Sequence, residues 1–255
     1  MSALVHYRVE GSLARLTLDS PDNRNALSTT LVNQLLQGLS DAAEESGVRA
    51  VVLGHTGGTF CAGADLSEAS RRDPGHIVVD QARELTELLR GILELPTPVI
   101  AAVNGHVRAG GLGLVGACDI AVAGPNSTFA LPEARIGVAP SIISLTLLPK
   151  MTARAAGRYF LTGEKFGTAE AASIGLITIA ADDVEATVNA LTADIGHASP
   201  QGLAASKALT TKSILEAFDQ HAEELTAKSA RLFASEEARE GILAFLQKRP
   251  PSWVG

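Results

Sequence analysis

The sequence predicts an α/β fold built from loosely repeated strand–strand–helix units, with a helical C-terminal part. Val99–Val103 is an uninterrupted apolar run, typical of a fully buried strand. Residues 48–54 predict a second buried strand, and both strands lead through glycine-rich loops towards segments that favour helix. Beyond residue 184, helical stretches follow one another with only short breaks.

The composition describes a globular chain and excludes several classes of protein. Its 255 residues, 46% of them hydrophobic, suffice for one large domain or a domain with an appendage. The net charge of −7 argues against nucleic-acid binding, and no apolar stretch is long enough to span a membrane. Cys61 and Cys118 lie far apart in apolar surroundings, so we expect reduced thiols and a cytoplasmic protein. The histidines lack paired ligand spacing, so we expect no metal site.

The N-terminal elements follow from alternation and capping. Residues 7–10 and 13–18 alternate apolar with polar side chains around Gly11, which predicts a β-hairpin. Ser28 is a suitable N-cap for an amphipathic helix over about 29–46.

The second half of the chain is mainly helical. After an apolar strand at 118–122, we expect helices at 152–160 and 168–174 and a short strand at 177–179. The C-terminal helices have too few apolar residues for a core of their own, so they need the main domain or a neighbouring subunit. These helices are predicted at 184–198, 200–217, 219–234 and 236–246.

A glycine-rich loop follows the strand at 99–103. Asn104-Gly105 breaks the strand, and Gly110-Gly111 stands before a short helical segment at 112–117. Free N–H groups at a helix start attract negative charge, which indicates a main-chain anion site. Close packing of the helix on the sheet would also select glycine, so both interpretations stay open.

A second loop of the same kind precedes Asp65. Ala62-Gly63-Ala64 again offers main-chain N–H groups without bulky side chains, and Asp65 would suit the positive end of a helix dipole. Two N–H donors from two parallel turns can converge on one oxygen, which is the geometry of an oxyanion hole.

A motif that imitates a dinucleotide-binding fingerprint overlaps the first loop. Six residues separate the strand from Gly110, and the following helix is short, so we set this interpretation aside. The glycines of the motif are Gly111, Gly113 and Gly116.

Several segments together resemble the enoyl-CoA hydratase (crotonase) family over nearly the whole chain. They are 25–27, 60–66, 104–111, 118–120, 129–137, 161–164, 169–171 and 175–176. The resemblance implies a spiral of ββα units with a C-terminal helical region that builds trimers, often paired as hexamers. It implies an acyl-CoA-binding catalytic domain at 1–195 and an oligomerisation region at 196–255.

The resemblance also implies a substrate site. The N–H groups of Ala64 and Gly110 would hold the thioester oxygen of an acyl-CoA, with coenzyme A as part of the substrate and no separate cofactor. The other substrate-binding positions it implies are Arg24, Ala26, Leu27, Ala62, Asp65, Leu66, Arg108 and Gly113.

Of the two glutamates that hydratases of the family use, this chain matches one. Glu133 follows Pro132 as in the family, but Gly113 stands where the other glutamate is expected. Some bacterial hydratases of methylglutaconyl-type acyl-CoAs are similar to this chain at Gly113 and at 135–140. We therefore expect water addition to a 2-enoyl-CoA, with isomerisation of a 3-enoyl-CoA or non-catalytic acyl-CoA binding as alternatives.

Two further positions have open interpretations. Arg108 is a charge in an apolar loop, and we expect an internal ion pair with Asp119 or another buried acid, or else contact with a carboxylate on the substrate. Residues 141–151 should begin a helix that closes the acyl pocket, with Ser141-Ile142-Ile143-Ser144 where the family often has Gly-Gly.

Overall fold

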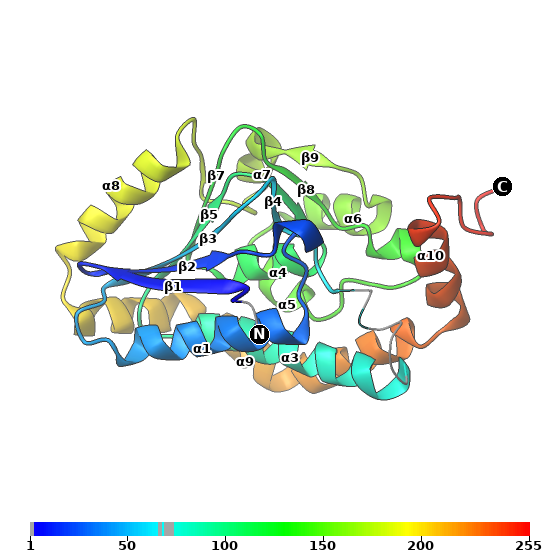
Figure 1. Ribbon diagram of the computed structural model, residues 1–255, viewed down its shortest axis with the longest axis horizontal. Coiled ribbons are helices and arrows are strands. Elements are labelled where there is room, and N and C mark those ends of the chain that lie inside the picture. Colours follow the sequence, from blue (N-terminus) through cyan, green and yellow to red (C-terminus); the bar gives the residue numbers. More distant parts are fainter. Residues whose placement is uncertain (1–2, 66–67, 69–73) are drawn as a thin grey trace.

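The computed structural model describes residues 3–65, 68 and 74–255, and it contains two β-sheets (Figure 1). The larger sheet consists, in spatial order, of β1 (Val5–Glu10), β2 (Leu13–Leu18), β3 (Ala50–His55), β5 (Val99–Val103), β7 (Ile120–Ala123) and β10 (Ile179–Ala180). The smaller sheet consists of β4 (Thr59–Cys61), β6 (His106–Arg108), β8 (Thr128–Ala130) and β9 (Phe166–Gly167).

Successive strand pairs divide between the two sheets. In each of the pairs β3–β4, β5–β6 and β7–β8, the first strand enters the larger sheet and the second enters the smaller sheet. Equivalent strands pair in parallel in both sheets. This arrangement confirms the repeated strand–strand–helix unit, and β1 and β2 form the predicted antiparallel hairpin.

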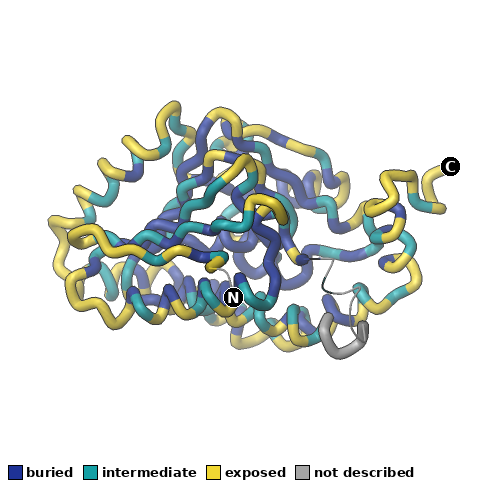
Figure 2. The backbone as a smooth tube through the Cα atoms, viewed as in Figure 1, coloured by how far each residue is buried: buried dark blue, intermediate teal, exposed yellow. Residues whose placement is uncertain are grey.

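The main core lies on one face of the larger sheet. Leu16 and Leu53 point into it, where α1 (Thr29–Glu44) and α3 (Pro74–Glu94) cover the sheet. Ser28 caps α1 as predicted, since its side chain accepts a hydrogen bond from the N–H of Leu31. The opposite face packs Val52 and its neighbours against α8 (Val184–Gly196), which is more exposed than the core helices (Figure 2).

The C-terminal helices differ from the prediction in one respect. α9 (Pro200–Phe233) is continuous, so the predicted break after residue 217 is wrong. Phe218 at that point is only 1% exposed and belongs to the main core, which holds the helix together there. α9 packs along α3, and Lys207 on α9 forms an ion pair of 2.8 Å with Asp119.

The other helices for which the structure gives bounds have at most 11 residues. They are η1 (Pro21–Asn23), α4 (Gly110–Ala117), η2 (Glu133–Ile136), α5 (Ser144–Leu147), α6 (Ala153–Thr162), α7 (Thr168–Ser173) and α10 (Glu236–Leu246). Among the residues described, no helix combines the length and hydrophobicity that crossing a membrane requires. Cys61 and Cys118 are buried free thiols, as expected.

Candidate active site

The two glycine loops that the sequence singles out meet in space. They follow β4 and β6, which are parallel neighbours in the smaller sheet. A Cβ atom placed on Gly63 would lie 3.1 Å from the backbone nitrogen of Gly110 and 2.7 Å from the Cβ of Ala109. Gly63 has a φ of +87°, so both its conformation and its surroundings require glycine. The loops are therefore in direct backbone contact.

Two N–H groups at this contact are available to a ligand. Leu27 pairs in parallel with Ala64: its N–H donates to the Gly63 carbonyl at 2.8 Å, and its carbonyl accepts from the N–H of Asp65 at 3.3 Å. In this pattern the N–H of Ala64 points away from Leu27. Gly110 is the first residue of α4, so its N–H has no partner within the helix. Neither N–H donates to a backbone carbonyl among the residues described.

Ala109, directly before Gly110, has a strained backbone. Its φ of 49° and ψ of −123° are unusual for a residue with a side chain. Strain of this kind typically costs about 1–3 kcal/mol and persists only where the surroundings fix it. The sequence carries no signal for it, because alanine ordinarily avoids this conformation.

Glu133 reaches the same region through strand register. The N–H of Ala109 donates to the carbonyl of Ala130 at 3.2 Å, and η2 begins with Glu133 three residues further on. The Glu133 side chain is buried, and its Oε2 atom has no hydrogen-bond partner within the described part of the chain. Burial raises the pKa of Glu133 from 4.5 to about 7. Near neutral pH this carboxyl can therefore both give and take a proton.

Gly113 and Ile143 form a single packing unit. A Cβ atom on Gly113 would lie 3.0 Å from the Cβ of Ile143 and still closer to its Cγ2, and it would lie 3.4 Å from Leu89 Cδ1. Ile143 is 3% exposed and fills the space that a side chain at position 113 would need. Gly113 and Ile143 both depart from the family pattern, and the space left by the missing side chain at 113 is filled by the larger side chain at 143.

The other glycines of α4 serve close packing. A Cβ on Gly111 would lie 2.7 Å from the Cys61 carbonyl oxygen, and one on Gly116 would lie 2.9 Å from that of Thr146. The dinucleotide-like motif therefore consists of glycines that α4 needs to approach β4 and α5.

The remaining predicted positions line up along the same two loops. The carbonyl of Arg24 accepts from the N–H of Ala62 at 3.1 Å, and Asp65 accepts from Asn23 Nδ2 at 2.9 Å. Ala26 and Leu27 are buried, and Leu66 lies outside the described residues.

Asn25 anchors these segments. Its side chain is fully buried and donates to the carbonyls of Thr56 and Thr59. It was not among the predicted site positions, although segment 25–27 is part of the family resemblance. Asparagine in a turn-rich loop is a further signal, since it tolerates the φ of 52° found here.

The expected ion pair between Arg108 and Asp119 is wrong. Asp119 pairs with Lys207 instead, because α9 brings that ammonium group to the start of β7. Arg108 is half-buried and donates to the carbonyls of Val107 at 2.7 Å and Thr128 at 2.6 Å, and to the Thr128 hydroxyl at 2.8 Å. The structure shows no salt bridge to it from a described acidic residue.

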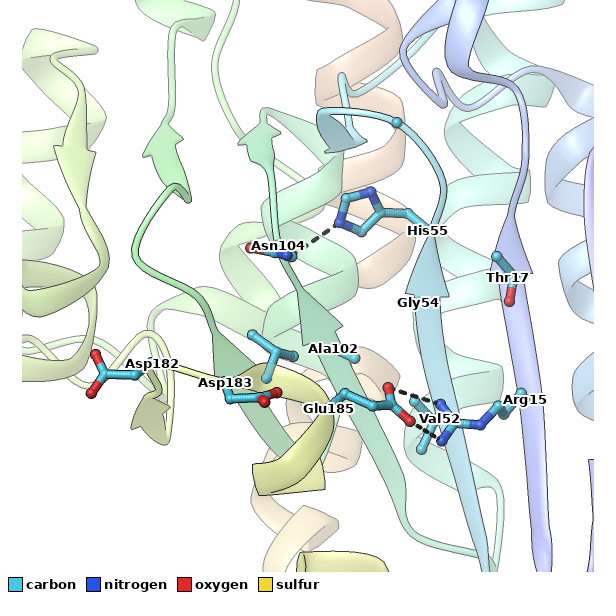
Figure 3. Close-up of a pocket in the computed structure, with 12 residues that line it drawn as sticks. Arg15, Thr17, Val52, Gly54, His55, Ala102, Asn104, Asp182, Asp183 and Glu185 are labelled. Atoms are coloured by element: carbon cyan, nitrogen blue, oxygen red, sulfur yellow. Dashed lines mark hydrogen bonds and ion pairs between the residues drawn. The ribbon is translucent and has the colours of Figure 1, made fainter. Parts of the chain in front are cut away.

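A separate cavity of about 490 Å³ lies on the α8 face of the larger sheet (Figure 3). An ion pair between Arg15 and Glu185 lies beside it, and the N–H of Asn104 donates to His55 Nε2 at 3.1 Å. The sheet separates this cavity from α4, so it is not part of the loop site. Within the described residues, no three His, Cys, Asp or Glu side chains gather where a metal ion could bind.

Comparison with known proteins identifies the family. Residues 8–255 match the family model for enoyl-CoA hydratase/isomerase, and the chain belongs to this family. A solved enoyl-CoA hydratase from Mycobacterium avium has 63% sequence identity and a TM-score of 0.93, with all of both chains covered. The chain is 32% identical to 2,3-dehydroadipyl-CoA hydratase of Escherichia coli and 30% identical to carnitinyl-CoA dehydratase of Proteus mirabilis, again over 100% of both chains.

Proposed function

We propose that this protein adds water to a 2-enoyl-CoA, with the N–H groups of Ala64 and Gly110 forming the oxyanion hole. Both groups come from loops in direct contact, and both are free of backbone partners in the described chain. Hydrogen bonds to the thioester oxygen would draw charge from the double bond and make the β-carbon electrophilic. Each donor is typically worth about 3 kcal/mol of barrier.

Glu133 would carry the protons. Its neutral carboxyl gives a proton to the α-carbon from one oxygen, while the other oxygen takes a proton from the water that adds to the β-carbon. Hydroxyl and hydrogen are thereby added across the double bond, and the carboxyl ends neutral, as it began. The observation that carries the proposal is the buried Glu133 carboxyl, which has an oxygen without a partner among the described residues and a pKa of about 7.

The test is Glu133→Gln, which keeps the shape but removes proton transfer. Acyl-CoA binding should survive, while turnover falls about 10²-fold or more. Crotonyl-CoA, a 3-enoyl-CoA and 3-methylglutaconyl-CoA should be assayed in parallel by mass spectrometry. An equally active variant would place the chemistry at another group.

Isomerisation between a 3-enoyl-CoA and a 2-enoyl-CoA is the second candidate, and the Gly113–Ile143 unit favours it. Ile143 closes the position from which a second carboxylate would act on water. One carboxylate suffices to move a proton between two carbons of the substrate. The carboxylate form of Glu133 would start this reaction, so its pH dependence is opposite to that of hydration.

We also propose a trimer or hexamer in the cytoplasm, with coenzyme A as part of the substrate and no further cofactor. The outer side of α10 supports assembly, because Leu243, Phe245 and Leu246 are 44–56% exposed there. A monomer by light scattering at micromolar concentration would contradict the proposed assembly.

A further inference from the structure

α10 packs directly on η2, the turn that carries Glu133. It lies at the end of the molecule opposite α8 (Figure 1). The buried side of α10 consists of the small residues Ala238, Gly241 and Ala244. Because these side chains are short, the backbone of the helix can approach the backbone of the turn.

The approach is closest at two glycines, one on each element. A Cβ atom on Gly241 would lie 2.6 Å from the Cα, carbon and oxygen atoms of Ile136, the last residue of η2. A Cβ on Gly137 would lie 2.7 Å from the carbonyl carbon of Glu237 and 2.8 Å from the nitrogen of Ala238. Real Cβ atoms essentially never come within 3.0 Å of such atoms, so a methyl group at either position must push α10 and η2 apart.

Glu133 is the first residue of this turn, and its side chain is buried. Its Oε2 atom has no hydrogen-bond partner among the residues described, so no described group holds that oxygen, and a shift of the turn backbone would carry the carboxyl with it. On its other side the turn is tied to the end of α6, since Arg135 Nε donates to the carbonyl of Thr162 at 2.8 Å. η2 is thus held between α6 and α10.

We propose that Gly241 is a positioning residue: by letting α10 lie directly on η2, it sets the depth at which the Glu133 carboxyl is buried. The importance of Gly241 for turnover rests on the proposed function, whereas its effect on the burial of Glu133 does not. A displacement of about 1 Å at a reacting group can cost about 10²-fold in rate.

The raised pKa of Glu133 comes from burial and not from neighbouring charges. Loosening the contact should therefore expose the carboxyl and lower its pKa. The charged residues of the packed elements are Arg135 of η2, Arg154 and Arg158 of α6, and Glu236, Glu237, Arg239 and Glu240 of α10.

The test is Gly241→Ala in the full-length protein. We expect kcat to fall about 10- to 100-fold while KM for the acyl-CoA stays within about threefold of wild type. Carbon-13 NMR of labelled glutamate carboxyls, with the Glu133 signal assigned by its loss in Glu133→Gln, should show its pKa falling from about 7 to below about 6.

Two controls separate positioning from loss of stability. Gly157→Ala places a methyl in open space on α6, so kcat and the Glu133 pKa should stay at wild-type values. Val188→Ala opens a cavity in the small core beside α8, so Tm should fall without a change in the pKa.

Ala238→Ser tests the same contact if Gly241→Ala does not fold. The substitution adds one oxygen atom to the same buried side of α10, so it should separate helix and turn by less and lower the pKa by a smaller amount. A wild-type pKa in whichever of the two variants folds would overturn the proposal. A lowered pKa with undiminished turnover would support it and would contradict the proposed role of Glu133 instead.

Discussion

The glycine loops and the Glu133 turn, which together make up the proposed site, are held in different ways. The loops are fixed by backbone packing, with Gly63 against Gly110 and Gly111 against Cys61. The Glu133 carboxyl, by contrast, has an oxygen without a partner in the described chain. Donors that stabilise a developing charge work best when they cannot move, whereas a proton carrier needs a free oxygen. The two regions meet these opposite requirements.

The largest expected effect comes from a substitution in the glycine loops. Gly110→Pro deletes one proposed oxyanion donor at the first position of α4, where proline suits the helix. Gly110→Ala is the matched control, because it keeps the N–H and adds a methyl whose one tight contact is the flexible end of the Leu27 side chain, at 3.1 Å.

The proline variant should have a kcat about 10²- to 10³-fold below that of the alanine variant. Circular dichroism and Tm would verify that both are folded. Equal activity of the two folded variants would show that the Gly110 N–H is not an oxyanion donor.

The second effect concerns the cost of burying Glu133. Its folded-state pKa of about 7 exceeds the ordinary 4.5, so its contribution to stability is fully present below pH 4.5 and is lost as the pH rises through 7. Glutamine cannot ionise, so Glu133→Gln should gain stability relative to wild type over this window, by up to about 3 kcal/mol. Denaturant unfolding at several pH values measures it, and a difference independent of pH would contradict the burial of this carboxyl.

A third, smaller effect sharpens the comparison at Gly113. Gly113→Glu alone should destabilise the fold, because Ile143 occupies the space that the new side chain needs. Adding Ile143→Gly should relieve the conflict. Hydration by the double variant should then exceed that of Ile143→Gly alone by about tenfold or more if a second carboxylate assists water. No gain in a folded double variant would show that Glu133 alone suffices.

The smallest effect is expected at Arg108. Because its guanidinium already binds the carbonyls of Val107 and Thr128, Arg108→Leu should cost about 1–3 kcal/mol of stability and affect crotonyl-CoA and 3-methylglutaconyl-CoA alike. Steady-state kinetics on both substrates, with Tm, measure this. A rise in KM confined to the carboxylated substrate would mean that Arg108 binds that carboxylate.

The sequence was informative where local patterns decide the structure. Alternation predicted the N-terminal hairpin, and the apolar run at 99–103 predicted β5 with the same bounds. The two glycine junctions predicted that the loops at Gly63 and Gly110 meet, and parallel pairing of β4 with β6 brings them together.

Features that depend on distant packing could not be predicted in this way. Lys207, the partner of Asp119, lies on α9. Ile143, which fills the space next to Gly113, lies directly before α5. The contact of Gly241 with Ile136 joins segments about a hundred residues apart, a separation that local periodicity does not address. The continuity of α9 was missed because the burial of Phe218 depends on the main core.

The most direct test of the central claim is the pH dependence of kcat/KM for hydration of crotonyl-CoA. If neutral Glu133 donates the proton, activity should be constant below about pH 6 and fall tenfold per pH unit above about 7, where the carboxyl ionises. The residual activity of Glu133→Gln should not show this fall above about pH 7. A profile that is flat from pH 5 to 9, or one that rises through pH 7, would contradict proton donation by Glu133; the rising profile is the one expected for the isomerase.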